Sequence, residues 1–328
     1  MRGFDLSKDQ SQGHVDIPKL RAGHVGAVFF ALYTSASLAP DAATRRALEM
    51  TASVFDAVGR NSEDLALATS PDEILSNRAS GKISILLGME NGAPIQRSLS
   101  LLRLFHRLGV RYMTLTHNGD NEIADCAAVG TRWGGLSPFG REVVAEMNDL
   151  GMMIDVAHVS DRTFFDCIAA SRAPILSTHS CCRALAGHPR NMTDEMLRTL
   201  ADHGGVIQIN FYPVFLSDAY GAALAARGLD PDDETVSEQV FAIPRPSFRA
   251  VADHIDHAVR VAGVESVGIG SDFDGIGVAP EGLENASKMP VLFDELRRRG
   301  YTESQLEKIA GGNFLRVFND VISSRLCK

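Results

Sequence analysis

The amino-acid sequence predicts an α/β fold, a TIM-type (β/α)8 barrel, and three observations carry that prediction. Apolar runs of strand length alternate with stretches of helical periodicity, which is typical of βαβ units and a parallel sheet. Five of these runs end on a side chain that can bind a metal or transfer a proton, as barrel strands do at their C-terminal ends. The length of 328 residues fits one barrel with insertions, so residues 1–328 are expected to form a single domain.

Seven strands and eight helices are predicted along the chain. The predicted strands are Val25–Leu32, Ile83–Leu87, Tyr112–Thr116, Met152–Ala157, Ile175–Thr178, Val206–Phe211 and Val267–Gly270. The predicted helices are Ala42–Val58, Leu99–Leu108, Pro138–Leu150, Asp161–Ser171, Thr193–His203, Phe248–Ala262, Pro290–Arg299 and Thr302–Val321. The last of them begins with the sequence TESQ, which resembles a capping box.

The count of seven strands is one fewer than a closed barrel of this type needs. The spacings inside the chain leave little room for another strand, so the missing strand is expected at an end of the chain. One long stretch, residues 213–246, is rich in Ala, Gly, Asp and Pro and is predicted to be an irregular insertion loop. A loop of that length usually covers a site or mediates contacts.

Composition and charge argue against several classes of partner. The net charge is −9 and no basic stripe is present, so a nucleic-acid partner is not expected. No apolar run reaches the roughly 18 residues that a membrane span needs. The five cysteines show no CxxC spacing and the first ten residues lack the apolar core of a signal peptide, so a reduced, cytoplasmic location is predicted.

Glu90, His158 and His179 form the best candidate set of metal ligands. Each lies at the C-terminal end of a different predicted strand, and such side chains converge in a barrel. A carboxylate with two imidazoles suits zinc and leaves one coordination position open. A single histidine at a strand end is more often a hydrogen-bonded core residue, but several in succession with a carboxylate favour a metal site.

Asp272, in the sequence GIGSDFDG, is a candidate general base or acid beside a metal-bound water. The alternative is a loop aspartate that forms an Asx-turn, a role that Asp274-Gly275 fits better. His117, in TLTHNGDN, is a candidate ligand or a donor that stabilises an oxyanion.

Arg190 follows the strand of His179 after a short loop, where its guanidinium could clamp a substrate carboxylate with two hydrogen bonds. The alternative for Arg190 is a solvated surface arginine. His14 and Asp16 have the H-x-D spacing of a ligand pair, but no apolar run precedes them and Pro18 follows. Proline disfavours an interior strand at this point, so metal ligation by His14 and Asp16 is not favoured.

These motifs together resemble the membrane (renal) dipeptidase family, the M19 peptidases, from about Gly13 to about Val321. The shared blocks are IPKLRAGHVGAVFFALY, GMENG, YMTLTHN, GLSPFGREVV, IDVAHVS, APILSTHS, HPRNM, DHIDHA and GIGSDFDG. The resemblance implies a (β/α)8 barrel with two zinc ions, and a hydrolase of the metal-dependent amidohydrolase type. Its expected substrates are dipeptides, including those with a D-residue at the C-terminal position, and a homodimer is expected.

The resemblance also implies a role for each candidate residue. Glu90 resembles the carboxylate that bridges both metals, and His158 and His179 resemble the ligands of the second zinc. His117 and Arg190 resemble the groups that hold the substrate carbonyl and its terminal carboxylate. Asp272 resembles the acid/base that handles the nucleophilic water and the leaving amine.

The sequence departs from the family pattern at one point. The family's D-G-H-x-D-x-P motif, whose His and Asp hold the first zinc, is expected a few tens of residues before the IPKLRAG block, which begins here at Ile17. The first βα segment is therefore expected to be missing, and one of the two zinc sites lacks its usual ligands. Four alternatives stay open: a shortened ordinary dipeptidase, a mono-zinc form, a non-catalytic remnant, and a related amidohydrolase that acts on another small amide or a lactone.

Overall fold

The structure is a computed structural model that describes residues 5–229, 240 and 242–325. The chain divides into two compact units. The first unit consists of Met1–Val25, Thr178–Ala201 and Ile207–Asn313, and the second unit consists of Gly26–Ser177, Asp202–Val206 and Phe314–Lys328. Both units combine helices with parallel strands, which is the α/β organisation that the sequence predicts.

A parallel sheet built around one buried strand forms the centre of the second unit. Its strands are β1 (Ala27–Tyr33), β2 (Leu65–Leu67), β3 (Ile83–Glu90), β4 (Val110–Thr114), β5 (Met153–Asp155) and the start of β6 (Leu176–Ser180). Strand β3 pairs with β1, β2 and β4, and β5 pairs with β4 and β6. Every residue of β3 except the last, Glu90, is buried. Gly88 in this strand leaves room for the ring of Tyr112 on β4, which a Cβ at this position would strike.

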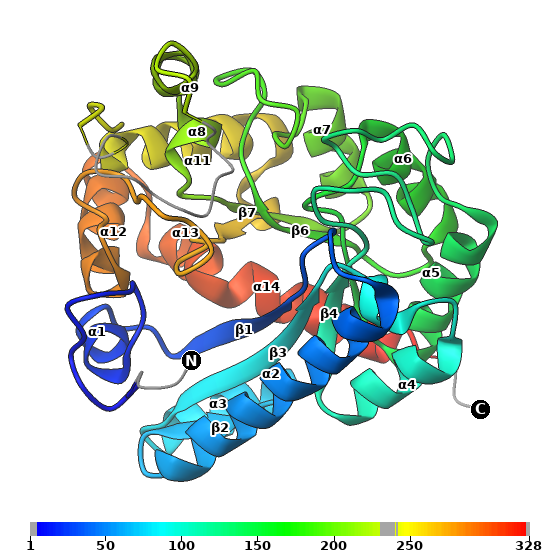
Figure 1. The fold of residues 1–328 in the computed structure, drawn as a ribbon. Helices are drawn as coiled ribbons and strands as arrows, with labels where there is room; N and C mark the ends of the chain where they lie inside the picture. Colours follow the sequence, from blue (N-terminus) through cyan, green and yellow to red (C-terminus); the bar gives the residue numbers. More distant parts are fainter. Residues whose placement is uncertain (1–4, 230–239, 241, 326–328) are drawn as a thin grey trace. The chain divides into compact units, whose positions relative to one another are not determined.

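Helices pack along this sheet and complete the second unit. They are α2 (Pro40–Arg60), α3 (Pro71–Ala79), η1 (Ala93–Ile95), α4 (Leu99–Arg107), α5 (Pro138–Leu150), α6 (Asp161–Ala170) and α14 (Asn313–Ser323). Figure 1 shows α2 running alongside β1 and β3. The hydrophobic core joins Leu86, Tyr112 and Met153 of the strands to Val317 and Phe318 of α14. Helix α5 has clear end signals: Ser137 caps its first turn, Pro138 follows, and Gly151 ends it in the left-handed conformation.

The first unit contains the chain's early helix and most of its C-terminal half. Its elements are α1 (Ile17–Ala22), α7 (Asp194–Asp202), β7 (Val206–Ile209), α8 (Pro213–Leu216), α9 (Asp218–Ala225), α11 (Phe248–Ala262), η2 (Val264–Ser266), β8 (Val267–Ile269), η3 (Ala286–Lys288), α12 (Met289–Arg298), α13 (Glu303–Glu307) and the π-helix η4 (Lys308–Gly312). Strands β7 and β8 are parallel partners. Helix α1 packs on η3, so the N-terminal segment contacts the loop that follows β8.

Each of the seven predicted strands coincides with an observed strand to within a few residues. The capping box at Thr302 is confirmed, because its hydroxyl accepts from the backbone of Gln305 and the Gln305 side chain accepts from the backbone of Thr302. The helix predicted at Thr302–Val321 is instead three consecutive segments, α13, η4 and α14. The single-domain prediction stays a prediction.

Two expectations about the chain's interior were wrong. Strand β2 and helix α3 occupy the interval between α2 and β3, although the spacings inside the chain were predicted to leave little room for another strand. Three residues are too short to show a period of two, which explains why β2 was missed. Residues 213–225, predicted to be loop, form α8 and α9, while residues 230–239 and 241 of the predicted loop lie outside the described residues.

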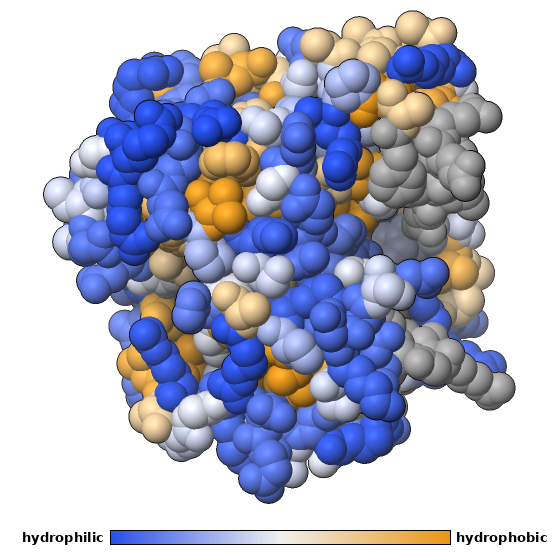
Figure 2. Space-filling view, turned by 90° about the vertical axis from the view of Figure 1, so that its left-hand side faces the viewer, coloured by the Kyte–Doolittle hydropathy of each residue, from blue (hydrophilic) through white to orange (hydrophobic). Residues whose placement is uncertain are grey.

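Across the described residues, the helices are all too short or too polar to cross a membrane. Hydrophilic residues cover most of the face drawn in Figure 2, and the hydrophobic residues on that face form small groups.

Asp16 is expected to be a major stabilising residue of the first unit. Its buried carboxylate caps α1 by accepting from the Lys19 backbone at 2.8 Å, accepts from the Gln10 backbone at 3.0 Å, and pairs with the Lys19 ammonium. We expect Asp16→Ala to lower the free energy of unfolding by about 3 kcal/mol, because it removes a helix cap and the buried carboxylate partner of Lys19, which then pairs with the exposed Asp9 alone. Urea unfolding of Asp16→Ala and of Asp16→Asn, which keeps a capping oxygen, would measure the effect. Wild-type stability in Asp16→Ala would contradict this interpretation.

Candidate functional site

Three potential metal ligands gather in the second unit. Glu90 is the last residue of β3, and His117 and His158 each lie shortly after the neighbouring strands β4 and β5. One donor atom from each side chain lies within 4.8 Å of the others. His158 Nε2 is 3.3 Å and His117 Nε2 is 3.9 Å from Glu90 Oε1. The cluster arises because neighbouring parallel strands deliver their last residues to the same edge of a sheet.

Contacts with neighbouring side chains fix both imidazoles of this cluster. Asn118 Oδ1 lies 3.1 Å from His158 Nδ1, so a proton on Nδ1 leaves the Nε2 lone pair directed toward Glu90. The His158 backbone oxygen accepts from Thr116 Oγ1 at 3.2 Å and from the Ala127 backbone at 2.8 Å. The two imidazole rings lie 4.3 Å apart, and the edge of Tyr33 packs against His117.

Aspartates hold the loop that follows His117. Asp120 accepts from the backbone N–H groups of Cys126, Thr131 and Arg132. Asp125 is buried and accepts from the backbone of Trp133 and Gly135. These bonds satisfy backbone groups that have no strand or helix partner, and they make this loop a defined support for Asn118 and His158.

The donor set of this cluster fits a metal ion. One carboxylate and two imidazoles are ligands that zinc commonly takes in catalytic sites, and all three side chains are largely buried. The sequence predicted Glu90, His158 and His179 as the metal ligands, and that ligand set stays a prediction. Among the residues that the structure describes, the third member of the cluster is His117, while His179 belongs to the first unit.

The first unit carries a second group of candidate residues around Asp272. Asp272 lies just after β8, and Asn210, just after β7, donates to its Oδ2 at 3.1 Å. Burial raises the pKa of Asp272 to about 6, against the opposing effects of the Asn210 hydrogen bond and of the nearby Arg190 and His14 side chains. The only hydrogen bond described for its carboxylate is that from Asn210, rather than the loop N–H of an Asx-turn.

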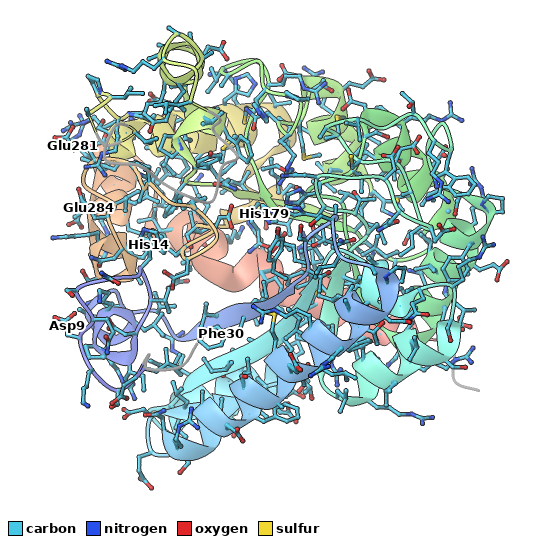
Figure 3. The ribbon with its side chains drawn as sticks, in the orientation of Figure 1. Asp9, His14, Phe30, His179, Glu281 and Glu284 are labelled. Carbon is cyan, nitrogen blue, oxygen red and sulfur yellow. The ribbon has the colours of Figure 1, made fainter. Side chains whose placement is uncertain are left out.

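Arg190 is buried, so the alternative of a solvated surface arginine was wrong. Its Nη2 donates to the backbone oxygen of His179 at 3.3 Å, and its guanidinium lies 5.3 Å from the ring centre of Phe215. His179, labelled in Figure 3, is buried on β6, and its Nδ1 lies 2.7 Å from Thr178 Oγ1. A buried guanidinium of this kind is suited to binding a carboxylate.

Two polar residues of these groups were missed by sequence reasoning. Asn118 and Asn210 act through hydrogen bonds to other candidate residues. The signal that could have found Asn210 is its place directly after the run Val206–Ile209, the same strand-end position that singled out Glu90 and Asp272. Asn118 directly follows His117, but a polar residue in a loop carries no distinguishing pattern.

Comparisons with known proteins point to dipeptidases and metallopeptidases. The model of the membrane dipeptidase family, peptidase family M19, matches residues 1–325. An uncharacterised dipeptidase of Schizosaccharomyces pombe is 37% identical over 96% of this chain and 74% of its own length.

Two solved structures resemble this chain over nearly its whole length. The probable dipeptidase PvdM from Pseudomonas aeruginosa matches with a TM-score of 0.88 at 28% identity, over 98% of this chain and 92% of its own. A metallopeptidase from Rhodobacter sphaeroides, liganded with a phosphinate mimic of the dipeptide L-Ala-D-Ala, matches with a TM-score of 0.83 at 25% identity, over 96% and 92%. The predicted TIM-type α/β fold class is confirmed by these matches.

The raised pKa of Asp272 predicts a pH-dependent stability. A raised folded-state pKa means that folding favours the protonated acid, so its stabilisation is complete below about pH 4 and is lost as the pH rises through about 6. We expect the stability of wild type relative to Asp272→Asn, measured by urea unfolding with a chelator present, to fall by on the order of 2 kcal/mol over this range. A difference that stays constant from pH 4 to 8 would contradict the raised pKa.

Proposed function

This chain belongs to the membrane dipeptidase family, peptidase family M19, and on that premise we propose that it is a zinc enzyme whose dipeptide substrates include those with a C-terminal D-residue. Its enzyme class, metallo-dipeptidase, follows from the family and its relatives. The observation that carries the proposal is the cluster of Glu90, His117 and His158, which gathers a zinc-type donor set. The dipeptide mimic bound to the Rhodobacter sphaeroides relative supports the choice of a D-residue substrate.

We assign the metal to the residues of this cluster. Glu90 and His158 would hold the ion, with His179 as the further ligand that the family resemblance implies. His117 either completes the ligand set or donates a hydrogen bond to the developing oxyanion. The chemistry that a zinc ion held there would supply is polarisation of the scissile carbonyl and a lower pKa of a water molecule.

The remaining roles fall on Asp272 and Arg190. With a pKa of about 6, Asp272 can exchange a proton near neutral pH. In the proposed reaction it accepts the proton of the attacking water and gives it to the amide nitrogen as the C–N bond breaks, so that the free carboxylate and amine products form. Arg190 would bind the terminal carboxylate of the dipeptide with two parallel hydrogen bonds.

A second candidate function is hydrolysis of another small amide or of a lactone by the same metal chemistry. The buried position of Arg190 favours the dipeptide, because a buried guanidinium makes charge-assisted hydrogen bonds to a carboxylate, which a lactone without that group cannot accept. The rates of hydrolysis of a dipeptide and of the same dipeptide with a C-terminal amide separate the two functions, because only the first substrate carries the terminal carboxylate.

Metal analysis tests the cluster. We expect the wild-type protein to bind at least one zinc ion, and we expect Glu90→Gln and His158→Asn to lower zinc affinity by at least about 100-fold, because each removes a ligand atom. His117→Asn decides between the two roles of His117. If His117 is a ligand, the variant loses zinc affinity. If His117 donates to the oxyanion, the variant keeps its zinc affinity and its kcat falls. Isothermal titration with zinc measures affinity, and Asp16→Asn serves as a control that should bind as wild type. Unchanged affinity in both Glu90→Gln and His158→Asn would overturn the assignment.

Substrate kinetics test Arg190. We expect Arg190→Met to raise KM for a dipeptide by roughly 30- to 100-fold, the cost of removing a charge-assisted bidentate contact. The same variant should treat a C-terminally amidated dipeptide much as wild type does, since that substrate lacks the carboxylate. Arg190→Lys is the matched control, because lysine keeps the positive charge but lacks the planar guanidinium that binds a carboxylate with two parallel hydrogen bonds. An unchanged KM for the dipeptide in Arg190→Met would count against this role.

A further inference from the structure

The sequence His14-Val15-Asp16 has no part in the proposed reaction, and the structure shows what its histidine contacts. The backbone N–H of His14 donates to Asp274 Oδ1 at 2.6 Å, and the backbone N–H of Asp274 donates to His14 Nδ1 at 2.9 Å. The His14 backbone oxygen also accepts from Ala286 at 3.1 Å. His14, labelled in Figure 3, thus joins the N-terminal segment to the loop after β8 by three hydrogen bonds.

The loop that His14 binds has a strained backbone next to the candidate acid/base. Asp272 has φ 59° and Asp274 has φ 65°, both in the left-handed region that aspartate occupies only at some cost. The turn closes with a bond of 3.0 Å from the Gly275 backbone to the Asp272 backbone oxygen. A Cβ at Gly275 would collide with Asp272 Oδ1, so the turn lies directly against that carboxylate. Such a conformation persists only where its surroundings hold it.

Aromatic contacts reinforce the same turn. The ring of Phe273, between the two strained residues, lies 5.3 Å from the His14 ring and 5.5 Å from the Phe211 ring. Phe211 directly follows Asn210, the donor to the Asp272 carboxylate. The turn is therefore held by His14 on one side and by the segment that carries the Asp272 donor on the other.

We propose that His14 is a positioning residue for Asp272. Its Nδ1 accepts a hydrogen bond from the Asp274 backbone and its backbone N–H donates to the Asp274 side chain, and these two bonds hold the turn that carries Asp272. The consequence for catalysis rests on the proposed function, since it assumes that Asp272 transfers the proton. A metal-ligand role shared with Asp16 does not fit, because Asp16 caps α1 and pairs with Lys19 while His14 Nδ1 accepts from Asp274.

Two substitutions separate positioning from simple loss of a side chain. His14→Ala removes the acceptor of the Asp274 N–H, while His14→Asn places an amide oxygen close to the position of Nδ1 and can accept the same bond. His24→Asn is the matched control, since His24 is an exposed histidine of the same unit whose positive φ asparagine tolerates. Should His14→Ala fail to fold, His14→Gln replaces it, because the glutamine amide lies nearer to Nε2 than to Nδ1.

Amide hydrogen exchange tests the contact without reference to activity. We expect exchange of the Asp274 N–H to be at least 10-fold faster in His14→Ala than in wild type, and to stay near the wild-type rate in His14→Asn and His24→Asn. Equal protection of this amide in His14→Ala and wild type would overturn the proposal, whether or not the protein hydrolyses dipeptides.

Steady-state kinetics on a dipeptide with the zinc-loaded enzyme test the consequence. We expect His14→Ala to lower kcat about 10-fold with KM within twofold of wild type, and His14→Asn to restore most of kcat, because displacement of a proton-transfer group slows the chemical step. A parallel rise in KM, or a failure of His14→Asn to restore kcat, would indicate general disruption and overturn the positioning role. If wild type turned over no dipeptide, the proposed function would fail and the exchange result alone would decide whether His14 holds the turn.

Discussion

The register of β3 is the constraint on which the candidate metal site depends. Glu90, the last residue of this strand, is paired with Tyr33 at the end of β1 and with Thr114 at the end of β4. Side chains alternate between the faces of a strand, so a slip of one residue would move Glu90 to the opposite face and away from both imidazoles. Burial along the rest of β3 fixes the register, because the same slip would disturb its whole packed length.

The two candidate carboxylates lie in contrasting surroundings, and each suits a different task. Glu90 has two imidazoles within 4 Å of its Oε1, an arrangement that favours binding a cation. Asp272 is held by one neutral amide, and burial dominates its pKa. A carboxyl group whose pKa lies near the working pH can give and take a proton, whereas a metal-binding carboxylate needs to remain ionised.

Much of the fold and part of the candidate site could be predicted because both follow from local pattern. Alternating strands and helices, with chemistry-bearing residues at strand ends, located all seven predicted strands together with Glu90, His117 and His158. Strand β2 was missed because three residues show no periodicity, and residues 213–225 were taken as loop because their composition is rich in small residues. Asn210 had the position of a strand-end residue, but the hydrogen bonds that Asn118 and Asn210 make could not be predicted, because they depend on contacts that only the folded chain creates.

The H-x-D spacing at His14 shows why a motif needs its backbone before it has a meaning. On an extended strand, residues two apart point to the same face and can bind one metal. Here Asp16 is the N-cap of α1, with Pro18 in the first turn, so the chain enters a helix at this point. Asp16 therefore caps the helix, and His14 forms hydrogen bonds with a turn 260 residues away in the sequence. The same two residue types that hold a metal elsewhere thus stabilise the N-terminal segment and connect it to the backbone beside Asp272.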